Sequence, residues 1–122
     1  MYFFNLKFQG KTALVTGSGT GIGKSIATKF VENGASVIIL GRRRDPLDEA
    51  AKDLEQIISD KSSGASVKIF AGVDVADESA MNAMFDTLKN ENINLDYVIN
   101  NAGVSGPVTC FPNSPLKDFK ST

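Results

Sequence analysis

A strand, a glycine-rich turn and a helix are predicted to follow one another in Lys11–Lys24, which reads KTALVTGSGTGIGK. Residues 12–16 are a short run rich in apolar and β-branched side chains, a composition typical of a buried strand. Four glycines follow at alternate positions, and from residue 21 apolar residues recur at helical spacing. The predicted buried face of this helix carries Ile22, Ile26, Ala27, Phe30 and Val31. Because a helix N-terminus offers unpaired N–H groups to an anion and glycines let a ligand approach the backbone, this stretch predicts a phosphate-binding turn.

The spacing of the glycines distinguishes between nucleotide motifs. The dinucleotide pattern G-x-G-x-x-G fails, because residue 22 or 24 would have to be glycine. The P-loop pattern G-x-x-x-x-G-K-[ST] matches residues 23–25, but its first position, 18, is serine, which leaves a phosphotransferase as an alternative. The pattern T-G-x-x-x-G-x-G fits Thr16, Gly17, Gly21 and Gly23.

Strand and helix signals alternate along the rest of the chain, which predicts an α/β fold with a parallel sheet and crossover helices. Further strands are expected at 37–40, 67–70 and 95–100, with Lys68 marking an edge strand. Asp45 and Pro46 are expected as the N-cap and first residue of the second helix, and Asp77 as the N-cap of the third.

Right-handed crossovers then give a Rossmann-type doubly wound sheet with strand order 3-2-1-4 and the first two helices on one face. The expected domain core spans residues 8–103, with an irregular tail over 104–122. Ligand would bind beyond the carboxyl ends of strands 1 and 4.

Arg42, Arg43 and Arg44 directly follow the predicted second strand and its closing glycine. A cofactor with a free ribose 2′-OH is usually held by an acidic residue at this point, whereas guanidinium groups pair with a 2′-phosphate. The sequence therefore predicts NADP(H) in preference to NAD(H), with Arg42 as the contact. A solvated arginine loop is the alternative, and it weighs more for Arg43 and Arg44.

Together with Asn100–Gly103, which resembles an N-N-A-G signature, the T-G-x-x-x-G-x-G motif resembles the cofactor-binding half of the short-chain dehydrogenase/reductase family. The resemblance covers Phe8 to Gly103 and implies that Asp74, helped by the backbone of Val75, contacts adenine. A turn-forming or helix-capping role is the alternative for Asp74. The predicted cofactor-binding residues are Gly17, Ser18, Thr20, Gly21, Ile22, Gly23, Arg42, Asp74, Val75, Asn101, Ala102 and Gly103.

The same resemblance implies a catalytic serine and a Tyr-x-x-x-Lys pair after the fourth strand. Tyr2 and Tyr97 are the two tyrosines of the sequence, and neither has lysine four residues later, so no catalytic residue is assigned. The expectation is a truncated, N-terminal half of an NADP(H)-dependent oxidoreductase that would act on a carbonyl, alcohol or enoyl substrate when completed. Homo-oligomerisation is compatible with it. A catalytically silent nucleotide-binding or interaction module is the alternative.

Composition limits which partners, metal sites, catalytic groups and disulfides are expected. The net charge of −1 gives no reason to expect nucleic acid or a membrane as partner, and the absence of histidine excludes His-based metal sites and Ser-His catalysis. A single cysteine, Cys110, excludes an internal disulfide, and a cytoplasmic setting is expected. The aromatic segment Met1–Phe8 is too short for a signal peptide and is expected to pack along the sheet edge or a partner subunit.

Overall fold

The computed structural model describes residues 7–17 and 21–101 of the 122-residue chain. Strands and helices alternate throughout this part, as the sequence predicted. The elements are β1 (Thr12–Thr16), α1 (Gly21–Glu32), β2 (Ser36–Gly41), α2 (Arg44–Lys61), β3 (Val67–Ala71), α3 (Glu78–Asn90) and β4 (Tyr97–Ile99).

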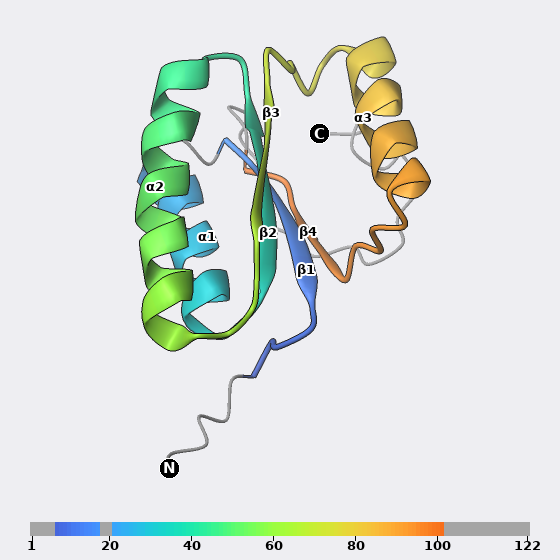
Figure 1. Cartoon of the computed structure of the whole chain (residues 1–122). Helices are drawn as coiled ribbons and strands as arrows, with labels where there is room; N and C mark the ends of the chain where they lie inside the picture. Colours follow the sequence, from blue (N-terminus) through green and yellow to red (C-terminus); the bar gives the residue numbers. More distant parts are fainter. Residues whose placement is uncertain (1–6, 18–20, 102–122) are drawn as a thin grey trace.

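The four strands form one parallel sheet in the order β3-β2-β1-β4, which confirms the predicted topology. Helices α1 and α2 cover one face of the sheet and α3 covers the other (Figure 1). At the centre of the sheet Val15 of β1 is in register with Ile39 of β2 and Ile99 of β4. All four carboxyl ends therefore lie at one edge, where a ligand site is expected in such a sheet.

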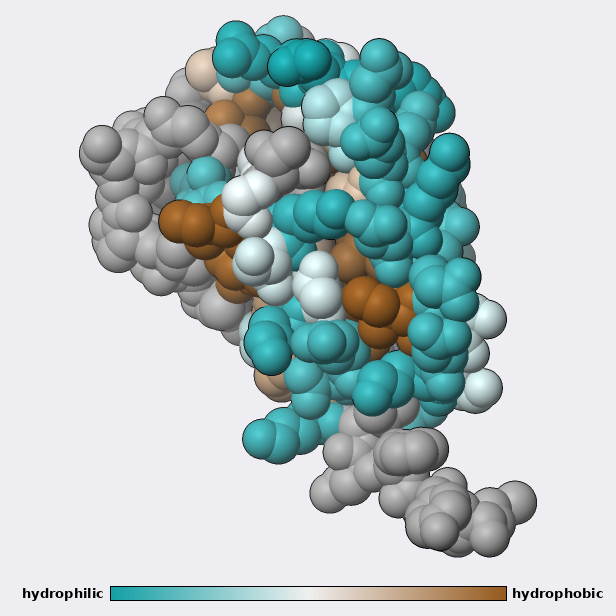
Figure 2. Space-filling view, turned by 90° about the vertical axis from the view of Figure 1, so that its left-hand side faces the viewer, coloured by the Kyte–Doolittle hydropathy of each residue, from teal (hydrophilic) through white to brown (hydrophobic). Residues whose placement is uncertain are grey.

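Two apolar cores lie on the two faces of the sheet. Alternate residues of each strand point to opposite faces, so one strand contributes to both cores. The core under α1 and α2 includes Ala13, Val15, Ala27, Val31, Val37, Ile39, Leu47 and Leu54. The core under α3 consists of Leu14, Ile38, Leu40, Met81, Met84, Leu88 and Val98. Figure 2 shows that the outer surface on the α1–α2 side is mostly hydrophilic, with hydrophobic patches between the polar groups.

The side of α1 that faces the sheet agrees with the prediction except at its first residue. Ala27, Phe30 and Val31 are buried and Ile26 packs against the core, as predicted, whereas Gly23 is buried and Ile22 is 69% exposed. Residues four apart lie one above the other on a helix, so burying position 23 turns position 22 away from the sheet. At the start of α1, the glycine therefore indicates the packed face better than the neighbouring isoleucine does, because a glycine allows the helix to approach the turn closely.

The start of α2 also differs from the prediction. The helix begins at Arg44, and its N-cap is Arg43, whose side chain makes no capping hydrogen bond. Pro46 is thus the third helical residue, which is tolerated because the first four N–H groups of a helix have no partner within it. By contrast, the predicted cap of α3 is confirmed, since Asp77 Oδ1 accepts a hydrogen bond from Ala80 N at 3.2 Å.

Strand β4 is shorter than predicted, with three residues in place of the six expected over 95–100. At its start, Asp96 and Thr12 exchange two hydrogen bonds: Thr12 N donates to Asp96 Oδ2 and Asp96 N donates to Thr12 O, both at 2.9 Å. These bonds join the amino ends of β1 and β4. At this end of the two strands, a side-chain carboxylate therefore takes the place of a backbone carbonyl as one of the hydrogen-bond acceptors.

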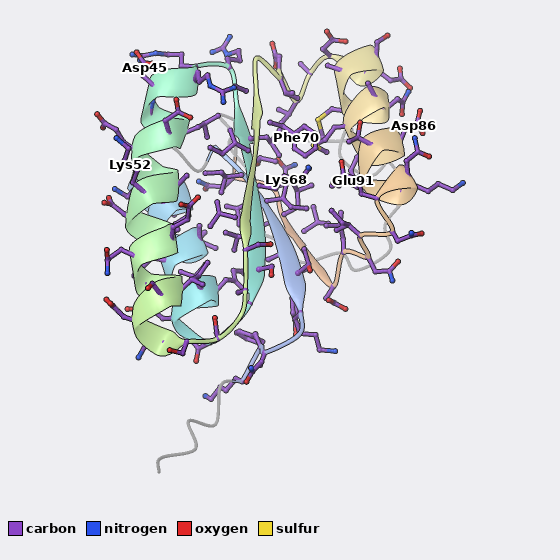
Figure 3. All side chains as sticks on the ribbon, viewed as in Figure 1. Asp45, Lys52, Lys68, Phe70, Asp86 and Glu91 are labelled. Carbon is purple, nitrogen blue, oxygen red and sulfur yellow. The ribbon has the colours of Figure 1, made fainter. Side chains whose placement is uncertain are left out.

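Lys68 lies on β3, which is an edge of this sheet as predicted. Its Nζ contacts Glu91 Oε1 at 2.9 Å, just beyond the end of α3, and lies 5.6 Å from the centre of the Phe70 ring. Figure 3 shows these three residues in the space between β3 and α3. No helix among residues 7–17 and 21–101 is long and apolar enough to cross a membrane.

Candidate cofactor site

The glycine-rich turn brings the carboxyl end of β1 against the first turn of α1. Gly17 and Gly21 have φ values of +62° and +64°, which glycine adopts readily because it lacks a Cβ. A Cβ on residue 23 would lie 2.1 Å from Gly17 O and 3.0 Å from Asn101 Nδ2. Around Gly21, by contrast, no described atom beyond its chain neighbours and the α1 backbone lies within 4 Å of the position that a Cβ would take. Among the described residues, the turn is therefore closed on its inner side and open beside the N-terminus of α1.

Thr16 joins this turn to the end of β4. The residue is fully buried, and its Oγ1 accepts a hydrogen bond from Asn101 N at 2.8 Å. The same oxygen lies 3.4 Å from Ile99 O and from Asn100 Oδ1, either of which can accept its proton. Thr16 was not among the predicted site residues, although it is the first letter of the T-G-x-x-x-G-x-G motif. Its role is to hold the ends of neighbouring strands together.

A hollow of about 330 Å³ lies between the end of β1 and the start of α2. Arg42 and Arg43 line it, together with Gly17, Leu40, Gly41, Pro46 and Leu47. Arg44 instead lies along α2, where its Nε is 3.5 Å from Asp48 Oδ2. The structure therefore separates the three arginines: two line the hollow beside the glycine turn, and the third forms an ion pair within a helix.

Asp74 lies on the loop after β3, and this loop is held against the end of β2 by a hydrogen bond from Val73 N to Gly41 O at 3.1 Å. Asp74 Oδ1 accepts a hydrogen bond from Ala76 N at 2.9 Å, so the side chain takes part in the local turn. The neighbouring Val75 is half-buried and packs against the core under α3. The turn-forming role considered for Asp74 is thus present, and it orients the carboxylate at the carboxyl edge of the sheet.

Lys24 does not point toward the glycine-rich turn as the lysine of a P-loop would. Its Nζ forms an ion pair with Asp53 Oδ2 of α2 at 2.5 Å. Ile22 lines a separate apolar hollow of about 530 Å³ along the outer side of α1, with Phe8, Ile26 and Phe30 among its other walls.

Five of the predicted site residues thus fall into three groups. Gly17, Gly23 and Asn101 meet directly, Arg42 shares a hollow with Gly17, and Asp74 follows the neighbouring strand. Ser18, Thr20, Ala102 and Gly103 lie outside the described residues. Within the described part of the chain, no three His, Cys, Asp or Glu side chains form a group that could hold a metal ion.

The arrangement fits a dinucleotide. The open side of Gly21 leaves room for a pyrophosphate at the N-terminus of α1, whose first turn contains no acidic residue to repel it. The arginine-lined hollow is adjacent because it shares Gly17 with this turn. A second anionic group could be held there.

A family model described as short chain dehydrogenase matches residues 11–122. The NADP-dependent (R)-specific alcohol dehydrogenase of Lentilactobacillus kefiri is 39% identical over 99 residues, which are 81% of this chain and 36% of that protein. A 3alpha-hydroxysteroid dehydrogenase of Mediterraneibacter gnavus is 34% identical over 116 residues, 94% of this chain and 44% of that protein. The chain thus spans less than half the length of these relatives.

Solved structures of short-chain dehydrogenases and reductases also match part of their length to this chain. L-Sorbose reductase from Gluconobacter frateurii, crystallised with NADPH and L-sorbose, superposes with a TM-score of 0.69 at 33% identity. The match covers 87% of this chain and 38% of the reductase. A short-chain type dehydrogenase/reductase from Mycobacterium ulcerans superposes with a TM-score of 0.71 at 36% identity, covering 83% of this chain and 35% of that one.

Proposed function

We propose that this chain, which belongs to the short-chain dehydrogenase family, forms the cofactor-binding part of an NADP(H)-dependent oxidoreductase. Members of this oxidoreductase family bind nicotinamide dinucleotides. The observation that carries the cofactor preference is the hollow in which Arg42 and Arg43 lie beside Gly17. A 2′-phosphate is a dianion that guanidinium groups bind through paired, charge-assisted hydrogen bonds. The NADP-dependent relative and the NADPH-bound neighbour support this preference.

Each group of site residues has a distinct part in this proposal. The N-terminus of α1 and the open side of Gly21 hold the pyrophosphate, and Arg42 and Arg43 hold the 2′-phosphate. Asp74 and the backbone of Val75 contact the adenine ring. Asn101 and the two residues that follow it border the ribose. Ser18, Thr20 and the backbone of Ile22, whose side chain lines the separate apolar hollow, complete the predicted contacts around the phosphates.

A nicotinamide cofactor held by these residues would supply hydride transfer, to a carbonyl or enoyl substrate or from an alcohol. In this 122-residue sequence neither tyrosine is followed by lysine at the fourth position, so we assign it no proton donor. We propose that the chain binds cofactor but by itself does not turn over substrate. The substrate class is proposed for the complete oxidoreductase, in a cytoplasmic setting.

The test is an NADPH titration of the purified chain, followed by nicotinamide fluorescence, with size-exclusion chromatography on the same sample. We expect saturable binding by a discrete species, with NADH bound more weakly and ATP more weakly still. A folded, monodisperse chain that binds neither dinucleotide would contradict the proposal. Equal affinity for NADPH and NADH would leave the dinucleotide site but remove the preference for NADP(H).

A further inference from the structure

The turn between α1 and β2 contains Asn33–Gly34, the one Asn–Gly pair in the sequence. Gly34 has a φ of +92° and closes the helix in a Schellman arrangement. Gly34 N donates to Val31 O at 3.1 Å, and the next residue, Ala35, donates from its N to Phe30 O at 3.0 Å. The backbone nitrogen that follows the asparagine is therefore hydrogen-bonded within the turn.

The Asn33 side chain and carbonyl are held as well. Asn33 Nδ2 donates to Lys29 O at 2.8 Å, which directs the amide back along α1. Asn33 O accepts a hydrogen bond from Phe8 N at 2.8 Å. The Phe8 ring in turn packs against Phe30 and Tyr97, with centroid separations of 5.4 Å to each. This turn thus fastens the segment before β1 to the aromatic cluster at the amino end of the sheet.

We propose that Asn33 is a deamidation site that the fold keeps closed and that opens when this turn opens. The reaction needs Gly34 N to lose its proton to base and to form a bond with Asn33 Cγ. The bond from Cγ to the side-chain amide nitrogen then breaks, ammonia leaves, and a succinimide ring remains. Water opens the ring to aspartate or isoaspartate. Glycine favours the attack because no Cβ hinders the nitrogen.

In the folded turn both reacting groups are occupied, by Val31 O and by Lys29 O. Both hydrogen bonds must break before the nitrogen can reach Cγ, so the rate follows the population of a locally open state. The modification also makes the opening persist. Isoaspartate lengthens the main chain by one methylene, which is incompatible with the Schellman turn, and aspartate places a carboxylate at the negative end of the α1 dipole.

The test incubates the full chain in mildly alkaline buffer, with and without urea, and follows Asn33 by peptide mapping. We expect deamidation at Asn33 to be roughly tenfold or more slower in buffer than in urea, as local protection requires. Asn82, which precedes alanine within α3, serves as the internal comparator and should deamidate more slowly than Asn33 in urea. Equal rates at Asn33 in buffer and urea would overturn the proposal.

A Phe8→Ala variant separates opening of this turn from the chemistry of the Asn–Gly pair. It removes one ring of the aromatic cluster and leaves the Asn33–Gly34 sequence intact. In buffer, deamidation at Asn33 should be faster in the variant than in the wild type. In urea, the two proteins should deamidate at the same rate. An unchanged rate in buffer would show that the Phe8 ring does not control the opening and would overturn that part of the proposal. If the variant does not fold, the wild-type comparison in buffer and urea still decides the proposal.

Discussion

The carbonyl oxygen of Gly17 lies 2.1 Å from the position that a Cβ on residue 23 would occupy. No real Cβ contact is that short, so either the turn or the helix would have to move to accept a side chain. The side-chain nitrogen Nδ2 of Asn101, at 3.0 Å from the same position, closes the space further. This contact between the first and last glycines of the motif sets the distance between β1 and α1.

Gly23→Ala is expected to lower the free energy of unfolding more than Gly21→Ala does, whereas both variants should weaken NADPH binding. The alanine at 23 displaces a backbone carbonyl. A methyl group at 21 costs about 1–2 kcal/mol for its left-handed backbone and enters the space proposed for the pyrophosphate. Urea unfolding and NADPH titration of both variants measure the difference. Equal free energies of unfolding in the two variants would show that the contact with Gly17 does not shape the turn.

Arg42→Ala is expected to weaken NADPH binding by about 10- to 100-fold and to leave NADH binding nearly unchanged, because a hydrogen bond to a charged group contributes about 1.5–3 kcal/mol. Arg44→Ala is the matched control, since Arg44 forms an ion pair with Asp48 and does not line the hollow. Titration with the two cofactors tests the assignment. Parallel losses for NADPH and NADH would remove the 2′-phosphate contact from Arg42.

Thr16→Val keeps the shape of a buried side chain and removes its hydroxyl. Asn101 N then loses its acceptor, at a cost of about 1–3 kcal/mol in the free energy of unfolding. Thr16→Ser retains the hydroxyl and should lie closer to the wild type. Urea unfolding measures both. A valine variant as stable as the serine variant would show that the hydroxyl does not join β1 to β4.

Lys24→Met is expected to change the free energy of unfolding by less than about 1 kcal/mol and to leave NADPH affinity nearly unaltered. The ion pair with Asp53 lies at the surface, with side-chain exposures of 34% and 61%, so solvent screens it. Asp53→Asn should behave in the same way. Loss of nucleotide binding in the lysine variant alone would indicate a phosphate contact, as in a P-loop.

The elements and their order follow from local patterns. Buried strands at β1 and β2 and amphipathic helices are readable because burial repeats with the period of each structure, and right-handed crossovers then determine the order 3-2-1-4. The glycine motif and the arginines after β2 were readable for the same reason, since each follows directly from the end of a strand. Local signals did not locate the start of α2, because its N-cap, Arg43, makes no capping bond that a sequence pattern would mark.

The sequence by itself determined that a glycine turn, an arginine cluster and an asparagine pair would meet at one edge of a parallel sheet. Tertiary structure alone decided which side chains lie there. It turned Arg44 toward Asp48 and away from the hollow, exposed Ile22, and used the Thr16 hydroxyl to join two strands that lie 85 residues apart along the chain. These outcomes depend on distances between segments far apart in sequence, and periodicity within one segment carries no information about them.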